Sequence, residues 1–209
     1  MLSFETLITF FSAAILLALV PGPDNIFVLT QAAIRGKAAG IAVMLGLCTG
    51  LIGHSTAVAL GVAVIFQASA VAFTALKYVG AGYLVYLAWQ AFRASAEEIE
   101  NCPDESVPDY WKLYRRGIIM NMTNPKVSIF FLAFLPQFVD PARGSVSLQI
   151  LLLGGVFILA TILIFGGIAL LAGSLGEWLT RSSRVRSVLS KVAGTVFLGL
   201  AFKLATSQR

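Results

Sequence analysis

The chain has 209 residues, of which 58% are hydrophobic and only 12% are charged, and its formal net charge is +5. Soluble domains average about 45–50% apolar and about 25% charged residues, so this composition, with a mean hydropathy of +0.87, excludes an ordinary soluble domain. It indicates a polytopic membrane protein whose surroundings are the lipid bilayer. The basic residues are spread over short loops, so no nucleic-acid partner is expected.

Six segments are apolar over the roughly 20 residues that a membrane-spanning helix needs. They cover residues 7–34, 41–66, 70–92, 118–138, 148–172 and 188–206. The first segment is long for one crossing, and Pro21 and Pro23 predict an interruption within it. Proline removes a backbone donor and clashes with the carbonyl four residues earlier. Pro125 predicts a similar interruption in the fourth segment.

Lysine and arginine are concentrated in alternate loops. The basic loops are 35–40, 93–117 and 173–187, whereas loop 139–147 carries only Arg143. Because basic loops stay in the cytoplasm, both chain termini are predicted to face outward.

The long hydrophilic loop 93–117 separates two halves of the chain that resemble each other in sequence. Lys77–Leu84 matches Lys191–Leu198 at Lys, Gly and Leu, and Arg35-Gly36 matches Arg143-Gly144. Three spans per half would insert the second copy upside down, as in many transporters. Chance similarity between apolar helices is the alternative.

We therefore expect an all-α membrane protein of six transmembrane helices, arranged as two inverted three-helix repeats, with helices 1 and 4 interrupted by proline. The single polytopic domain, 1–209, would comprise repeat one (about 1–92), a cytoplasmic linker (about 93–117) and repeat two (about 118–209).

Both interruptions carry charged and polar residues. The first reads Pro21-Gly22-Pro23-Asp24-Asn25 and the second reads Asn121-Met122-Thr123-Asn124-Pro125-Lys126. An acid inside the membrane costs roughly 2.5–3.5 kcal/mol on insertion scales, and an unpaired buried charge is strongly destabilising. We therefore expect Asp24 and Lys126 to lie together and to neutralise each other. The alternative for Lys126 is a side chain that extends to the cytoplasmic interface.

The interruptions also free backbone groups. Half-helix N-termini near Asn25–Phe27 and Lys126–Ser128 carry partial positive charge and can bind a carboxylate. Asp24, with the freed carbonyls of Leu17, Leu19 and Asn121, can bind an ammonium group. Such a site suits a zwitterion. No cluster of carboxylates, histidines or thiolates indicates a metal, so neither a metal nor another cofactor is expected.

The two motifs, followed by Phe131–Phe138, resemble those of the LysE/RhtB family of amino-acid exporters over essentially the whole chain. The resemblance implies a transporter rather than an enzyme. It implies proton-driven export of amino acids or close derivatives across a bacterial inner membrane, with both termini periplasmic. The substrate-binding positions that it implies are Pro21, Gly22, Pro23, Asp24, Asn25, Asn121, Asn124, Pro125 and Lys126.

Two residues are candidates for carrying the coupling proton. One is Asp24, and the other is His54, which lies midway along the second span, because histidine is a common proton carrier in proteins. A neutral imidazole that binds a neighbouring helix is the alternative for His54. The glycine pairs Gly154-Gly155 and Gly166-Gly167 serve either internal packing or a homo-oligomer.

Two other functions stay open. One is a metal-ion or other small-solute exporter of the same superfamily. The other is a membrane redox conduit, which the separation of Cys48, in a span, from Cys102, in a loop, disfavours. The transported amino acid and the coupling ion do not follow from the sequence.

Overall fold

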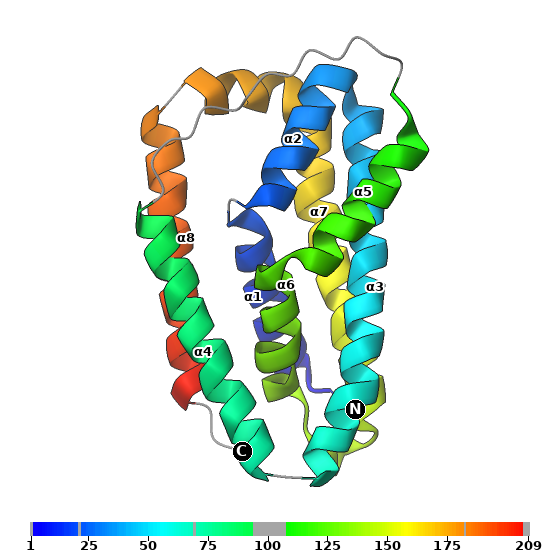
Figure 1. Cartoon of the computed structure of the whole chain (residues 1–209), viewed down its shortest axis with the longest axis vertical. Helices are drawn as coiled ribbons and strands as arrows, with labels where there is room; N and C mark the ends of the chain where they lie inside the picture. Colours follow the sequence, from blue (N-terminus) through cyan, green and yellow to red (C-terminus); the bar gives the residue numbers. More distant parts are fainter. Residues whose placement is uncertain (1, 21, 69, 94–107, 182, 207–209) are drawn as a thin grey trace.

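The computed structural model describes residues 2–20, 22–68, 70–93, 108–181 and 183–206, and every regular element in these ranges is helical. The α-helices are α1 (Phe4–Leu19), α2 (Pro23–Arg35), α3 (Lys37–Ala68), α4 (Ala70–Arg93), α5 (Tyr110–Thr123), α6 (Pro125–Ile129), α7 (Val146–Arg181) and α8 (Ser183–Thr206). Figure 1 shows them as an elongated bundle. The predicted all-α class is confirmed for these ranges.

Both predicted interruptions are present. α1 ends at Leu19 and α2 begins at Pro23, with 62° between the two axes. α5 ends at Thr123 and α6 begins at Pro125, and the segment Pro125–Phe138 is inclined by 51° to α5. In each case proline is the first residue of the second helix. A backbone N–H at this position has no carbonyl to bind within the helix, so proline loses no helical hydrogen bond there.

The chain after Pro125 is irregular. A π-helical segment, η1 (Phe130–Phe134), follows α6 directly and leads into a 3₁₀ segment, η2 (Leu135–Phe138). A second 3₁₀ turn, η3 (Pro141–Arg143), precedes α7. Single π-helical turns are rare and often occur at functional sites.

Two helices are long and apolar enough to cross a membrane, over Lys37–Gly61 in α3 and Val146–Ala172 in α7. Helices α1 and α2 are also long and apolar enough to cross a membrane if the bent pair is taken as one span, and so is α5 together with the segment Pro125–Phe138. The described residues therefore provide two clear membrane spans and up to four. Helices α4 and α8 lie where the third and sixth spans are predicted, and α5 begins at Tyr110, earlier than the predicted start at residue 118.

Helix α3 packs mainly against α5 and α7, while α4 pairs with α8. Close packing with α5 depends on glycine. A Cβ at Gly46 would collide with the carbonyl oxygen of Tyr114, and one at Gly117 would collide with that of Val43. Small residues let membrane helices approach in this way.

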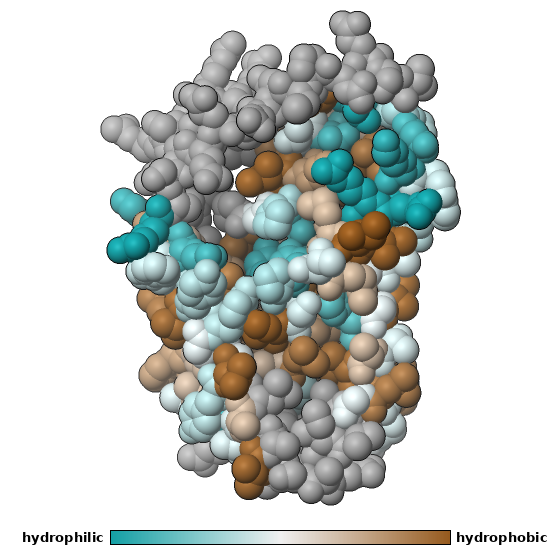
Figure 2. Space-filling model, viewed as in Figure 1, coloured by the Kyte–Doolittle hydropathy of each residue, from teal (hydrophilic) through white to brown (hydrophobic). Residues whose placement is uncertain are grey.

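The two ends of the bundle differ. In Figure 1 the chain termini lie at the lower end, whereas the α2–α3 and α7–α8 turns and the start of α5 lie at the upper end. Figure 2 shows hydrophilic residues gathered over α5 near the upper end and more apolar residues below them. Large apolar side chains such as Ile52, Leu151 and Leu163 are about half exposed on α3 and α7, as expected of a surface that faces lipid.

A block of aromatic rings fills the bundle below the second interruption. Phe130 lies at the centre, with ring centroids 5.9 Å from Phe10, 4.9 Å from Phe134 and 5.3 Å from Phe157. These side chains are almost completely buried. The block joins α1, η1 and α7.

Candidate functional site

The two interruptions are joined by the side chain of Asn124. Its Oδ1 accepts the backbone N–H of Lys126 at 3.0 Å and so caps α6, while its Nδ2 donates to Asp24 Oδ2 at 2.7 Å. A hydrogen bond to a charged group contributes about 1.5–3 kcal/mol. Asp24, in the first turn of α2, is only 3% exposed. One amide thus fixes the relative positions of the two half-helices.

Lys126 is also buried, with 8% of its surface exposed, so the alternative in which its side chain extends to the interface is wrong. Its Nζ lies 3.4 Å from the carbonyl oxygen of Val20, at the C-terminal end of α1. A cation is favourable there because the helix dipole is negative at that end. A Cβ at position 22 would lie 3.1 Å from this Nζ, which leaves little room for any residue but Gly22.

The expected direct pairing of Asp24 with Lys126 does not occur. Among the described residues, Asp24 binds Asn124 and Lys126 binds a backbone carbonyl, and no ion pair within 4 Å joins the two charges. The structure therefore brings both residues to the same junction, where each is hydrogen-bonded to a neutral group and Asp24 Oδ1 has no partner.

More carbonyls are freed at the first interruption than those of Leu17 and Leu19, which were predicted. Asn25 Nδ2 donates to the carbonyl of Ala18 at 2.6 Å, and the carbonyl of Val20 accepts from Lys126. Helix α1 keeps its regular bonding as far as the Val20 N–H, which donates to Leu16. The carbonyls beyond Leu16 lack intrahelical donors, and the two that meet the second half of the break are those of Ala18 and Val20.

The Asn121 carbonyl is freed as predicted, and His54 binds it. His54 Nε2 lies 3.2 Å from this oxygen, which also accepts the N–H of Asn124 at 3.1 Å. A carbonyl only accepts, so Nε2 carries the hydrogen in this structure. The ring also lies 5.6 Å from that of Phe131. The structure therefore agrees with the alternative of an imidazole bound to a neighbouring helix.

A small cavity lies at the junction, with a volume of about 20 Å³, enough for roughly one water molecule. Its polar lining comes from Asp24, Asn121, Lys126 and Thr161, and its apolar lining includes leucine and phenylalanine side chains from α1, α3 and α7. Ligand pockets measure about 300–1,000 Å³. The cavity in this conformation is therefore too small to hold an amino acid.

The predicted site residues that the structure describes divide into four groups. Asp24, Asn121 and Lys126 line the cavity, and Asn25 and Asn124 hold the surrounding backbone. Gly22, Pro23 and Pro125 start the half-helices, and His54 supports the Asn121 backbone. Pro21 lies outside the described residues.

Sequence reasoning missed Thr161. It belongs to α7, is 2% exposed and lines the same cavity as residues of the two interruptions. The signal in the sequence is a threonine in the middle of the mostly apolar fifth span.

The alternatives that involve metals or thiols find no support at this site. No group of three or more His, Cys, Asp or Glu side chains lies close enough to hold a metal ion in the part of the chain that the structure describes. Cys48 is a buried free thiol, and Cys102 lies outside the described residues.

Of the predicted glycine pairs, Gly154 packs internally, since a Cβ there would collide with the Ser55 hydroxyl. A Cβ added at Gly155 or Gly167 would have no atom within 4 Å.

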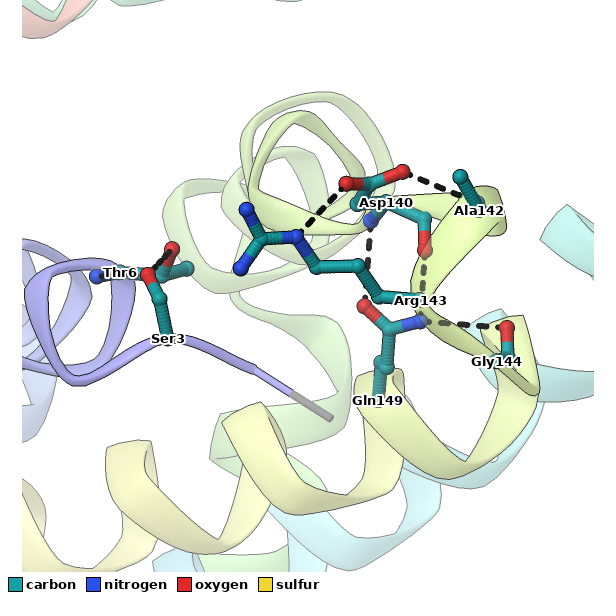
Figure 3. Close-up of polar contacts among 7 residues, drawn as sticks. All are labelled: Ser3, Thr6, Asp140, Ala142, Arg143, Gly144 and Gln149. Atoms are coloured by element: carbon teal, nitrogen blue, oxygen red, sulfur yellow. Dashed lines mark hydrogen bonds and ion pairs between the residues drawn. The ribbon is translucent and has the colours of Figure 1, made fainter.

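A second polar cluster lies near the start of α1 and α7 (Figure 3). Gln149 donates to the carbonyls of Asp140 and Gly144 at 2.8 and 3.2 Å and accepts the Asp140 N–H at 3.1 Å. Asp140 in turn accepts from Arg143 Nε at 2.9 Å. These bonds hold the turn between η2 and α7 in one conformation, and none involves a residue predicted for the site.

Comparison with known proteins gives one family. The model of the LysE type translocator family matches residues 15–208. The homoserine/homoserine lactone efflux protein of Salmonella typhimurium is 31% identical over 207 residues, which cover 99% of each chain. An uncharacterized membrane protein of Pseudomonas aeruginosa is 31% identical over 204 residues, 95% of this chain and 94% of the other. No solved structure matches. The resemblance noted in the sequence is confirmed, and the chain belongs to the LysE type translocator family.

Proposed function

We propose that this translocator exports amino acids or close derivatives from the bacterial cytoplasm in exchange for protons. The observation that carries the proposal is the junction itself, where buried Asp24 and Lys126 from two interrupted helices line one cavity. Intramembrane ionisable residues mark substrate and proton pathways. The name of the Salmonella relative, a homoserine efflux protein, supports the same substrate class.

The polar atoms around the cavity suit the two ends of a zwitterion. Asp24 Oδ1 and Asn121 Oδ1 belong to cavity-lining residues, are buried and have no hydrogen-bond partner. Both are acceptors and would receive the substrate's ammonium group. Lys126, with a long 3.4 Å bond to Val20, would exchange that bond for the substrate's carboxylate. An unpaired buried polar group costs about 1–3 kcal/mol. Substrate binding would therefore relieve part of the cost of leaving these oxygens without partners.

Asp24 is the preferred carrier of the coupling proton. A carboxylate holds an ammonium group only while it is ionised, so one residue would bind either the substrate or a proton. This mutual exclusion produces exchange. His54 is the second candidate, but its Nε2–H is already bound to the Asn121 carbonyl.

The proposed architecture is the six-span inverted repeat, with repeats at about 1–92 and 118–209 joined by the linker. Glycine geometry supports it. Gly36 and Gly144, aligned in the two halves, have φ values of 85° and 122°, and no other described residue has positive φ. Each follows an interrupted helix and precedes a long one, α3 or α7. The site would then lie near the midplane, where such repeats meet.

The proposed orientation places the upper end of Figure 1 in the cytoplasm. Arg35 and Lys37 flank the α2–α3 turn at that end, and the basic residues of α5 lie beside it. Both termini, at the lower end, would then face the periplasm.

Efflux from preloaded cells tests this function. Bacteria with and without the protein are loaded with a panel of dipeptides, whose hydrolysis raises single amino acids inside the cell, and the medium is assayed over time. We expect faster efflux of at least one amino acid, and a protonophore should remove the increase. Equal efflux for the whole panel would contradict export of amino acids, and efflux that the protonophore leaves unchanged would contradict proton coupling.

A further inference from the structure

The hydroxyl of Thr161 differs from other hydroxyls in these helices. Thr49, Thr56 and Thr123 each donate to the carbonyl four residues earlier, at 2.8–3.0 Å. Such bonds are the usual way for threonine to satisfy its hydroxyl in an apolar helix. Thr161 Oγ1 is buried and has no partner. Its side chain has therefore given up the local bond available to a helical threonine.

The position of this hydroxyl accounts for the difference. Thr161 lines the same cavity as Asp24, Asn121 and Lys126, and it reaches that cavity from α7 rather than from an interrupted helix. Asp24 Oδ1 and Asn121 Oδ1 are also unpartnered. Three of the residues that line this cavity thus each carry a buried polar atom without a partner. This indicates a polar ligand, because such an atom is costly to leave unpaired.

The charges around the cavity limit what that ligand carries. Its lining contains one acid, Asp24, and one base, Lys126, and these are matched by the ammonium and carboxylate of an amino acid. The cavity lining has no third charged residue that could neutralise an ionised side chain on the substrate. The Thr161 hydroxyl both donates and accepts, so it suits an uncharged polar group. The remaining lining is apolar, including Leu47, and favours a short aliphatic stem.

We infer that Thr161 is a specificity-determining residue whose hydroxyl binds a hydroxyl group on the side chain of the transported amino acid. This inference rests on the proposed amino-acid export. It assigns α7 a direct part in substrate selection. Loss of one neutral hydrogen bond should weaken substrate affinity roughly three- to tenfold.

The test compares two substrates of the same shape in proteoliposomes. Homoserine ends in a hydroxyl, and norvaline has a methyl group in its place. Their apparent KM values are measured for the wild-type protein and for the Thr161→Val, Thr161→Ser and Thr56→Val variants. Thr56 is the matched control, since it is exposed on α3 and bonded to Ile52.

We expect the wild-type protein to prefer homoserine roughly three- to tenfold. Thr161→Val should abolish this preference by raising KM for homoserine alone, with kcat nearly unchanged. Thr161→Ser should keep the preference, and Thr56→Val should behave as wild type. A merely structural role would instead change both substrates equally.

Two results would overturn the inference while leaving amino-acid export intact. One is equal KM values for homoserine and norvaline in the wild-type protein, and the other is an unchanged preference in Thr161→Val. Transport of neither amino acid, nor of any other in the preloaded-cell panel, would overturn the proposed function and the inference with it.

Discussion

The sharpest structural prediction concerns Asn124, which performs two tasks with one side chain. Its Oδ1 caps α6, and its Nδ2 binds Asp24 at 2.7 Å. Serine is about as good an N-cap as asparagine, but its side chain is too short to reach Asp24. Asn124→Ser therefore removes the bond between the interruptions and keeps the cap, whereas Asn124→Ala removes both.

The magnitudes follow from the two contacts. Losing a hydrogen bond to a buried carboxylate costs about 1.5–3 kcal/mol, which is the expected destabilisation of Asn124→Ser. Losing the cap adds about 0.5–2 kcal/mol, so Asn124→Ala should lose about 2–5 kcal/mol. Asp24 would also be left with neither oxygen bonded to protein.

Thermal unfolding of detergent-purified protein and transport in proteoliposomes check these values. We expect stability to fall in the order wild type, Asn124→Ser, Asn124→Ala, and we expect both variants to transport poorly at equal reconstituted amounts. Wild-type stability and transport in Asn124→Ser would refute the view that this bond joins the interruptions. Equal stability of the two variants would refute the separate role of the cap.

Three further predictions concern other parts of the molecule. Gly46→Ala should destabilise the α3–α5 contact by about 1–3 kcal/mol through overpacking, as measured by thermal unfolding, whereas Gly167→Ala, with no atom within 4 Å of the new Cβ, should not; equal effects would contradict the packing account. His54→Gln should keep the proton-driven part of transport, since glutamine can still donate to the Asn121 carbonyl. If a stable His54→Gln variant lost proton-driven transport, the coupling proton would be assigned to His54. Gln149→Leu should remove the side-chain partner of the Asp140 and Gly144 backbone groups, at about 0.5–1.5 kcal/mol per hydrogen bond, and should speed proteolysis of the η2–α7 turn. Unchanged cleavage would show that Gln149 does not hold this turn.

The sequence predicted the interruptions well because proline and glycine act locally. Pro23 and Pro125 each begin a new helix, whatever the tertiary contacts. The proximity of Asp24 and Lys126 also followed from the cost of isolated charges in an apolar interior. Their partners did not follow, because the choice between an ion pair and bonds to Asn124 and Val20 depends on the angle between helices, which no local pattern encodes.

Thr161 could not be predicted for a related reason. Its residue type is ordinary in an apolar helix, and its unpartnered hydroxyl becomes visible only when α7 packs beside the interruptions. The early start of α5 at Tyr110 was missed because its first turns are polar and follow the Asp109 cap rather than an apolar run.

Proton-driven uptake by the Asp24→Asn variant tests whether Asp24 couples transport to protons. Asparagine can still accept a hydrogen bond from Asn124, so the variant removes the titratable group with little change in shape. Proteoliposomes with an acidic lumen are supplied with labelled homoserine, and uptake is compared with and without the pH gradient. We expect the gradient to stimulate uptake by the wild-type protein and not by equally reconstituted Asp24→Asn. Equal stimulation of both proteins would contradict a coupling role for Asp24.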